Sequence, residues 1–218
     1  KQKTAYEIYQ CDWSSDVCSS DLLMSAAFVL GNGISRLAVD LNLLKQRGTV
    51  YGCNALYREF APDVLVSTDK GISHTIQHSG YAQNHVMYTR KPLPGLGARS
   101  VPQNYYGFSS GPIAVGIAAL DRHLAVYLVG FDMGPTAGNR FNNVYADTEF
   151  YKKSSSNPTF TGNWVRQIVT VTRDFPNISF HRVVGETTAE IAELSGIKNM
   201  RHMHMADFLD RINNIKDL

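Results

Sequence analysis

The sequence predicts an α/β protein in which a mostly parallel sheet is flanked by helices. Two short apolar runs, at residues 26–30 and 124–129, are typical of buried strands. Segments with helical periodicity alternate with such runs along the chain, which favours parallel strands joined by crossover helices. The first run stops at Gly31-Asn32-Gly33, and a helical pattern of Leu37, Leu41 and Leu44 follows. This order of strand, tight turn and helix is typical of a Rossmann-like domain.

The first 22 residues are similar to a translated short-read sequencing adapter. Residues 1–8 and 12–22 match the constant parts of such an adapter codon for codon. We therefore expect residues 1–22 to be a non-native, disordered tail on an assembled environmental sequence, with Met24 or a lost upstream residue as the true start. Residues 23–218 are predicted to form a single Rossmann-like nucleotide-binding domain.

Charge and cysteine content argue against several classes of protein. Residues 1–22 hold two lysines and four acidic residues, so the net charge of +2 becomes +4 for the rest, which does not indicate nucleic-acid binding. Cys53 is the only cysteine after residue 22, so we expect no disulfide framework and a reducing, cytoplasmic setting. No apolar run approaches the roughly 18 residues of a membrane span. The composition is compatible with both a monomer and a homo-oligomer.

Strands in the first half of the chain end at polar residues. We expect strands at residues 26–30, 49–53, 64–68 and 86–88, helices at 37–45 and 70–78, and a Pro- and Gly-containing loop at 90–97. Asn54 follows the second strand and Asp69 follows the third. The loop is of a kind that is usually exposed and often functional.

The second half holds a helix start and a long irregular segment. We expect helices at residues 110–120, 163–175 and 205–215, and strands at 124–129 and 178–183. Ser109, the small residues after it and Pro112 suit a helix start, whose N–H groups could bind a phosphate or carboxylate. Residues 133–160 are polar and aperiodic, which predicts a lid-like or binding loop after the strand that ends at Gly130-Phe131-Asp132.

Five strand ends carry polar residues, and parallel strands would bring them to one edge of the sheet. These are Gly31-Asn32-Gly33, Asn54, Asp69, Asp132 and His181, with the helix start Ser109-Ser110-Gly111 beside them. Such a set suits a nucleotide, with backbone amides for phosphate, Asn54 for the base or ribose, and a carboxylate for ribose hydroxyls or a metal. The alternative is a plain turn with Ser35 as a helix cap, since Arg36 replaces the third glycine of the dinucleotide fingerprint.

Other motifs give weaker indications. The pairs His74 and His78, and His202 and His204, have metal-ligand spacing, but no cysteine or acidic residue completes either set, so we predict no metal site. A serine nucleophile at Ser109 or Ser110 would need the Gly-x-Ser-x-Gly elbow, which is absent. We interpret Lys152 and Lys153 as part of a solvated loop. Asp132 could equally fix a loop.

Four segments together resemble a known family. Gly31-Asn32-Gly33-Ile34-Ser35, Gly52-Cys53-Asn54-Ala55-Leu56-Tyr57, Ser110-Gly111 and the run 126–132 are similar in order and spacing to the bacterial CMP-sialic-acid-dependent sialyltransferases. The run 126–132 also resembles motility-associated glycosyltransferase-like and archaeal hydroxymethylpterin pyrophosphokinase-like proteins. The resemblance covers residues 26–132. The chain also resembles uncharacterised proteins of marine tailed phages, from which no activity follows.

The resemblance implies a ligand, CMP or another nucleotide, and roles for particular residues. It implies that Asn32 and the backbone of residues 33–35 contact the phosphate and ribose, and that Asn54 contacts the nucleotide. Ser110 and Gly111 would hold the cytidine side, and Asp132 would close the pocket. Tyr145 and Tyr151 fall where the family has tyrosines that stabilise the leaving phosphate.

One departure from the family concerns catalysis. The sialyltransferases use a histidine as general base after the segment that matches Asp132, and no histidine occurs here between His123 and His181. A missing general base removes about two to four decades in rate, and His181 is the candidate substitute. Two functions follow: a nucleotide-sugar-dependent glycosyltransferase-like enzyme, or a non-catalytic nucleotide-binding protein, for instance one encoded by a phage.

Overall fold

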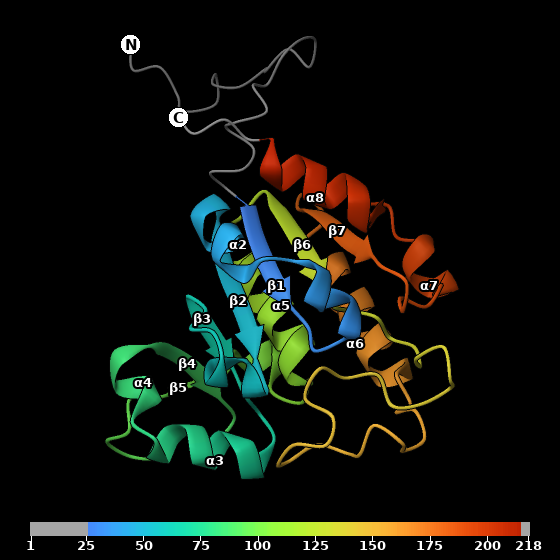
Figure 1. Cartoon of the computed structure of the whole chain (residues 1–218). Helices are drawn as coiled ribbons and strands as arrows, with labels where there is room; N and C mark the ends of the chain where they lie inside the picture. The colour runs from blue at the N-terminus through green and yellow to red at the C-terminus, as the bar shows by residue number, and fades with distance from the viewer. Residues whose placement is uncertain (1–25, 215–218) are drawn as a thin grey trace, which may run out of the picture.

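The computed structural model describes residues 26–214 of the 218-residue chain. The predicted tail at residues 1–22 and the end of the predicted last helix lie outside these residues. Within them, a single eight-stranded sheet runs in the order β5-β4-β3-β2-β1-β6-β7-β8, and every neighbouring pair is parallel. The predicted α/β class with a parallel sheet is confirmed (Figure 1).

The chain builds the sheet outward in two directions from β1. The strands are β1 (Ala26–Leu30), β2 (Thr49–Cys53), β3 (Val64–Val66), β4 (Val86–Thr89), β5 (Arg99–Ser100), β6 (Ala125–Val129), β7 (Ser179–Val184) and β8 (Met200–His204). Strands β2 to β5 extend the sheet on one side of β1, and β6 to β8 extend it on the other. The order of the strands therefore reverses between β1 and β6, which is where open α/β sheets commonly bind ligands.

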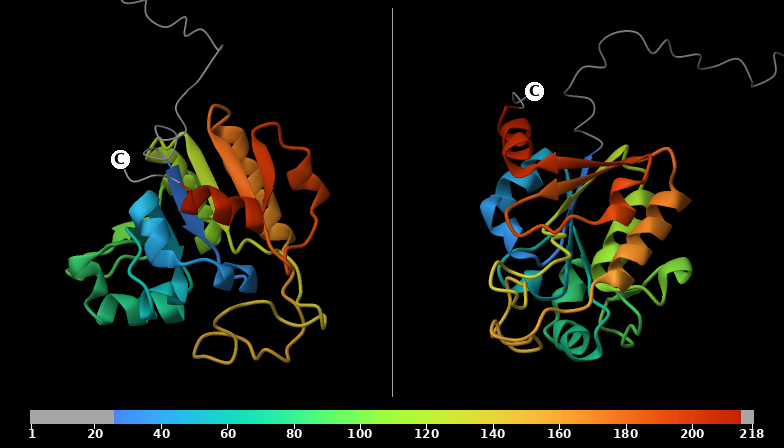
Figure 2. Two further views of the ribbon diagram at one scale, coloured as in Figure 1. Left: turned by 45° about the horizontal axis from the view of Figure 1, so that its top comes forward. Right: turned by 90° about the vertical axis from the view of Figure 1, so that its right-hand side faces the viewer.

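Helices cover both faces of the sheet (Figure 2). They are α2 (Leu41–Arg47), α3 (Lys70–His78), α4 (Tyr81–Asn84), α5 (Ser110–Leu120), α6 (Gly162–Asp174), α7 (Ala192–Ser195) and α8 (Met205–Asn213), with 3₁₀ turns η1 (Ile34–Ala38), η2 (Asn54–Arg58) and η3 (Gln103–Tyr105). Apolar residues of α5 and α6 pack in one core cluster. Those of α2, α3 and α8 pack in a second cluster on the other face.

The central strands are apolar along their whole length because both of their faces are covered. In β1, Ala27 and Val29 belong to the first cluster, and Ala26, Phe28 and Leu30 belong to the second. All five residues are fully buried. Alternating side chains of one strand thus hold the two helical layers together, and this fixes the position of the turn that follows β1.

Helix α5 is buried along most of its length. Nine of its residues are buried, and it carries small residues at several positions. A Cβ atom at Gly116 would lie 2.6 Å from the ring of Tyr105, so a larger residue there would push the helix away from its neighbour. The close packing holds the N-terminus of α5 beside the carboxyl ends of β1 and β2 (Figure 1).

Several predicted elements differ from those observed. The helix expected at 37–45 is two pieces, η1 and α2, because Asp40 caps a new helix by accepting from the N–H groups of Asn42 and Leu43. The short edge strands β5 and β8 were not predicted, and β8 contains both His202 and His204. The prediction that His181 ends its strand is wrong, since it lies in the middle of β7.

The segment between β6 and α6 contains no helix or strand and crosses the carboxyl edge of the sheet (Figure 1). Its residues 133–161 are called the lid loop below. Backbone hydrogen bonds fix it, including Val144 N–H to Asn32 O at 2.8 Å and Phe141 N–H to Ser156 O at 2.9 Å. The lid loop therefore has a defined conformation against the turn after β1.

Candidate ligand-binding site

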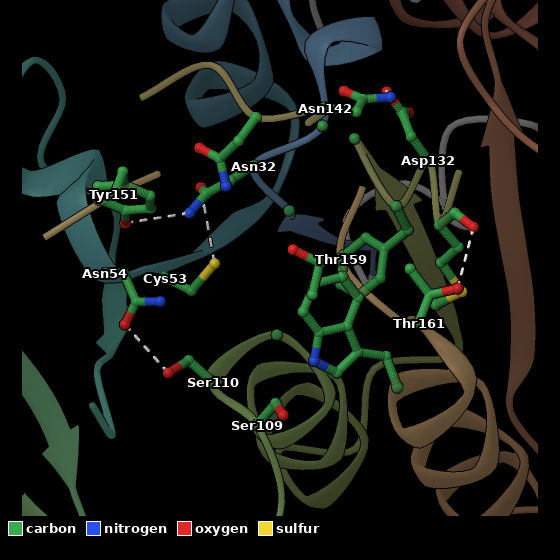
Figure 3. A pocket seen from close by; sticks show the side chains of 18 of the residues that line it. Asn32, Cys53, Asn54, Ser109, Ser110, Asp132, Asn142, Tyr151, Thr159 and Thr161 are labelled. Carbon is green, nitrogen blue, oxygen red and sulfur yellow. Dashed lines mark hydrogen bonds between the residues drawn. The ribbon is translucent and has the colours of Figure 1, made fainter. Parts of the chain in front are cut away.

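A cavity of about 330 Å³ lies at the carboxyl edge of the sheet. The residues after β1 and after β6 both line it, so it lies at the point where the strand order reverses. The start of η2, the N-terminus of α5 and the lid loop form the remaining walls. Figure 3 shows Asn54, Ser110 and Tyr151 on one side of the space and Thr159 and Thr161 on the other.

Most of the residues selected from the sequence meet at this cavity. Its lining includes Gly31, Asn32, Gly33, Asn54, Asp69, Ser109, Ser110, Gly111, Asp132 and Tyr151. Three others do not line it: Ser35, Tyr145 and His181. The convergence of the strand ends is therefore observed for four of the five segments. Of the two tyrosines selected for the phosphate, Tyr151 lines the cavity and Tyr145 does not.

The N–H groups of both glycines in the Gly31-Asn32-Gly33 turn are already occupied. Gly31 N–H donates to Val129 O at 2.8 Å, and Gly33 N–H donates to Gly130 O at 2.9 Å. A side chain at Gly31 would collide with the carbonyl of Gly130, so the glycine allows the ends of β1 and β6 to approach closely. The turn primarily joins these two strand ends.

The next N–H groups are occupied as well. Ile34 N–H donates to Asn142 Oδ1 at 2.9 Å, and Ser35 N–H donates to Asp132 Oδ2 at 3.1 Å. The phosphate contact implied for the backbone of residues 33–35 is therefore unavailable in this arrangement. A phosphate at this edge of the sheet would need other donors.

Asp132 fixes three segments to one another. Its carboxylate accepts hydrogen bonds from the Ser35 N–H and hydroxyl groups, from Asn142 Nδ2 at 3.1 Å, and from the Thr187 and Thr188 hydroxyls at 2.6 and 3.2 Å. The side chain is directed toward Asn142 rather than toward the centre of the cavity (Figure 3). Because five donors already surround a buried carboxylate, the loop-fixing interpretation of Asp132 fits better than binding of ribose or a cation.

A buried arginine, Arg182, binds the backbone next to Asp132. It was not identified from the sequence. Arg182 is 1% exposed, and its guanidinium donates to the carbonyl oxygens of Phe131, Asp132 and Ala189 at 2.9–3.0 Å. Burial lowers the pKa of Arg182 to about 10, while the Asp132 charge opposes this change. Arg182 therefore stays protonated at neutral pH and holds the chain at the end of β6.

Arg36, which replaces the third glycine of the dinucleotide fingerprint, supports the turn after β1 through hydrogen bonds. It donates to Gly31 O at 3.3 Å and to Asn32 Oδ1 at 3.4 Å. It also forms an ion pair with Glu59 at 2.8 Å and donates to the Tyr145 hydroxyl at 3.0 Å. That hydroxyl donates in turn to Glu59. Tyr145 thus belongs to a buried supporting network and cannot reach a phosphate in the cavity.

Asn54 presents a fixed hydrogen-bond donor to the cavity. Its backbone has a φ of +52°, a conformation that asparagine tolerates better than most residues. Its Oδ1 accepts from the hydroxyls of Ser67 at 3.1 Å and Ser110 at 3.0 Å, and Ser110 Oγ accepts from Thr68 N–H at 3.1 Å. This network orients the amide so that Nδ2 lies on the cavity side (Figure 3).

Tyr151 offers a second donor. Its hydroxyl accepts from Asn32 Nδ2 at 3.4 Å and from Ala55 N–H at 3.3 Å, so its own proton remains for another acceptor. Burial raises the pKa of Tyr151, and the nearby Cys53 and Asp69 add to the rise. The side chain is therefore a neutral donor rather than a phenolate at physiological pH.

The N-terminus of α5 adds donors to the same wall. The first backbone hydrogen bond at the N-terminus of α5 runs from Ile113 N–H to Ser109 O at 3.0 Å. The Ser109 side chain does not cap the helix. Within residues 26–214, the N–H groups of Ser110 and Gly111 have no acceptor. Unpaired N–H groups and the positive end of a helix favour an anionic or strongly polar ligand.

Two uncompensated charges lie at the cavity. Lys152 is the basic side chain in the lining, and its Nζ donates to Thr159 Oγ1 at 3.3 Å. Lys152 and its neighbour Lys153 are both exposed, in agreement with the interpretation of the pair as a solvated loop, but Lys153 does not line the cavity. Asp69 is exposed, and within the described chain its carboxylate forms no hydrogen bond or ion pair.

His181 lies apart from the site. Its ring stacks on Tyr127 with 4.7 Å between centroids, and Nε2 lies 3.0 Å from Ser179 Oγ. Burial lowers the pKa of His181 to about 4, and the charges of Arg211 and Arg201 act in the same direction. A neutral core histidine of this kind cannot serve the cavity as the general base. No histidine lines the cavity within the described residues.

Within residues 26–214, no three histidine, cysteine or acidic side chains come together as a metal site. Over the same residues, no helix has both the length and the apolar character needed to cross a membrane.

Comparison with known proteins gives similarities to solved structures only. No protein-family model matches the chain, and no curated protein matches it significantly. The sialyltransferase CstII from Campylobacter jejuni, in complex with cytidine-5'-monophosphate, is 14% identical over 73% of this chain and 79% of its own, with a TM-score of 0.46. The monofunctional α-2,3-sialyltransferase Cst-I from the same organism is 12% identical over 73% and 75%, with a TM-score of 0.49. An α-2,3-sialyltransferase of C. jejuni in apo form is 14% identical over 89% and 83%, with a TM-score of 0.49.

Proposed function

We propose that the protein is a nucleotide-sugar-dependent glycosyltransferase of the sialyltransferase-like kind, with CMP as the nucleotide part of its donor. The observation that carries the proposal is the set of unpaired donors at one cavity where the strand order reverses. Asn54 Nδ2, the Tyr151 hydroxyl proton and the first N–H groups of α5 all remain available for a ligand. Donors of this kind match a ligand rich in oxygen acceptors, such as a nucleotide.

The lid loop supplies the groups suited to the phosphate. Tyr151 is a neutral donor and Lys152 is a cation, and both line the cavity. When a sugar is transferred, the departing phosphate oxygen gains negative charge, and positioned donors and cations stabilise that charge. The α5 end and Asn54 are then left for the base and ribose. This division follows the cytidine position that the sequence resemblance implies for Ser110 and Gly111.

The alternative is a nucleotide-binding protein without catalysis. The observation that favours it is the lining of the cavity, which holds no histidine among the described residues. The two functions share the binding site and differ only in turnover.

Ligand-induced stabilisation and turnover test both functions. We would follow the melting temperature with CMP, UMP, AMP and GMP and expect the largest shift with CMP. Binding to the folded protein alone adds about 2.7 kcal/mol at a hundredfold excess over Kd. CMP release from CMP-sialic acid would support the transferase, while binding without release would support the alternative. No shift with any nucleotide would contradict both.

A further inference from the structure

We infer that Asp69 accepts the proton of the attacking hydroxyl group during sugar transfer. This inference rests on the proposed function, because it assigns a role in that reaction. The residue follows β3, begins α3 and lines the cavity. Three features support the assignment: the exclusion of other bases, the uncommitted carboxylate and its place in the cavity that Tyr151 also lines.

Other groups that line the cavity cannot take the proton. The Asp132 carboxylate is buried under five donors. Burial raises the pKa of the Cys53 thiol to about 12, so a thiolate is scarce at neutral pH. Lys152 is a donor to Thr159. Among the described residues that line the cavity, Asp69 is the remaining group able to act as a general base.

The Asp69 carboxylate is uncommitted in a place where it would normally be bound. An aspartate at the N-cap of a helix usually accepts from backbone N–H groups of the first turn. Here α3 begins without a side-chain cap, and the backbone carbonyl of Asp69 accepts from Ser73 N–H at 2.9 Å. The helix start is thus made by the main chain, and the side chain remains free to meet a ligand.

Asp69 lines the same cavity as Tyr151 and Lys152, the groups that we assign to the leaving phosphate. Its charge raises the pKa values of both Tyr151 and Cys53, although burial is the larger cause in each case. The lid loop docks closely here, since a Cβ atom at Gly71 would lie 3.0 Å from the ring of Phe150. The carboxylate therefore lines the same cavity as the hydroxyl that we assign to the phosphate.

The step balances with these groups alone. The acceptor oxygen forms a bond to the anomeric carbon of the sugar while its proton passes to the Asp69 carboxylate. The bond from the anomeric carbon to the phosphate oxygen breaks, and its electron pair leaves with CMP. Tyr151 and Lys152 stabilise that charge, and the proton is later released from Asp69 to water.

The isosteric variant Asp69→Asn tests the assignment. With CMP-sialic acid as donor and lactose or water as acceptor, we expect kcat to fall by about 10²–10⁴-fold, with the Kd for CMP changed less than about threefold. The variant Asp69→Ala, with the cavity opened, should regain part of its rate in formate, because an external carboxylate can take the proton. Asp207→Asn, on the exposed start of α8, is the matched control and should retain the wild-type rate.

The outcomes separate this inference from the proposed function. If the wild-type protein binds CMP but releases none from CMP-sialic acid, the proposed transferase fails and the inference fails with it. If the wild type turns over and Asp69→Asn keeps its kcat, only the inference is overturned. A large loss of CMP affinity with kcat unchanged would also overturn it, because Asp69 would then bind ribose hydroxyls instead.

Discussion

At the scale of single residues, Asn54 shows how the protein can hold one end of a side chain and leave the other end available at a cavity. Its oxygen is bound by two serine hydroxyls, so the amide cannot rotate without losing both bonds. Its nitrogen is thereby fixed on the cavity side (Figure 3). A donor that is already oriented costs little conformational entropy when a ligand binds.

Replacing Asn54 by aspartate should weaken CMP binding strongly. Aspartate tolerates the same backbone conformation and keeps the accepting oxygen, but it exchanges the donor for a negative charge beside the ligand. We expect the Kd measured by isothermal titration to rise by at least tenfold, since a hydrogen bond is worth about 1 kcal/mol and repulsion adds to it. Asn84→Asp, at the exposed end of α4, is the control. Unchanged affinity in Asn54→Asp would place the ligand elsewhere.

Lys152 and Lys153 allow a matched test of the phosphate position. Only the first lines the cavity, so Lys152→Met should reduce the affinity for CMP severalfold and leave that for cytidine unchanged, because cytidine has no phosphate. Lys153→Met should change neither affinity. Equal losses for CMP and cytidine in Lys152→Met would show that the lysine does not contact the phosphate.

His181 makes the stability of the fold sensitive to acid. The folded pKa of about 4 lies below the ordinary value near 6.5, so between these values the unfolded chain binds a proton that the folded protein excludes. The resulting stability is complete above about pH 6.5 and is lost as the pH falls toward 4. His181→Phe keeps the aromatic stacking and should lose less stability than the wild type between pH 7 and 5, by up to about 2 kcal/mol. Denaturant titrations that give equal losses for both proteins would refute this role.

At the scale of elements, Asp132 and Arg182 join β6, β7, η1 and the lid loop into one corner. Asp132→Ala would leave the donors of Ser35, Asn142, Thr187 and Thr188 without their acceptor. It would also remove the negative charge near the buried Arg182, whose own hydrogen bonds go to backbone carbonyls. Removing one partner of a buried charged network typically costs about 3–5 kcal/mol. We expect a loss of that size in urea unfolding, whereas Thr187→Val, which removes one donor to the carboxylate, should cost about 1 kcal/mol. A loss below 1 kcal/mol in Asp132→Ala would show that the corner relaxes freely.

The elements that the sequence predicts well are those whose pattern is set by burial on the sheet. Strands β1 and β6 are covered on both faces and are therefore apolar throughout. Strand β8 lies at an edge of the sheet, and its Arg201 and His202 are exposed. Its sequence therefore lacks both an apolar run and the β-branched or aromatic residues that usually indicate a strand. Strand β5 has two residues, too few for any periodicity. The break before α2 depends on the Asp40 cap inside a continuous leucine pattern.

In the candidate site, too, some features could be predicted from the sequence and others could not. Glycine and asparagine at strand ends mark the site in the sequence because the parallel topology brings all strand ends to one edge. The direction of a side chain leaves no such mark. Asp132 and Tyr145 turn toward supporting networks, while Lys152 lines the cavity. The carbonyl partners of Arg36 and Arg182 lie at the ends of β1 and β6. Because these partners are set by the tertiary fold, no local sequence pattern predicts the roles of the two arginines.

At the scale of the whole molecule, the position of the cavity follows from the order of the strands. The chain leaves β1 in one direction and resumes at β6 in the other, so the connections that follow these neighbouring strands separate. The resulting gap at the carboxyl edge is closed by the α5 end and the lid loop. The fold thus creates the space, and the lid loop supplies the charged and hydroxyl groups that would distinguish one ligand from another.

The central claim is that a nucleotide binds at this reversal of strand order, and a crystal structure with CMP tests it most directly. We expect the cytidine between Asn54 and the N-terminus of α5, with the phosphate within hydrogen-bond distance of the Tyr151 hydroxyl and near Lys152. CMP bound at any other surface, or a cavity left empty of CMP at concentrations that saturate the protein in solution, would contradict the account.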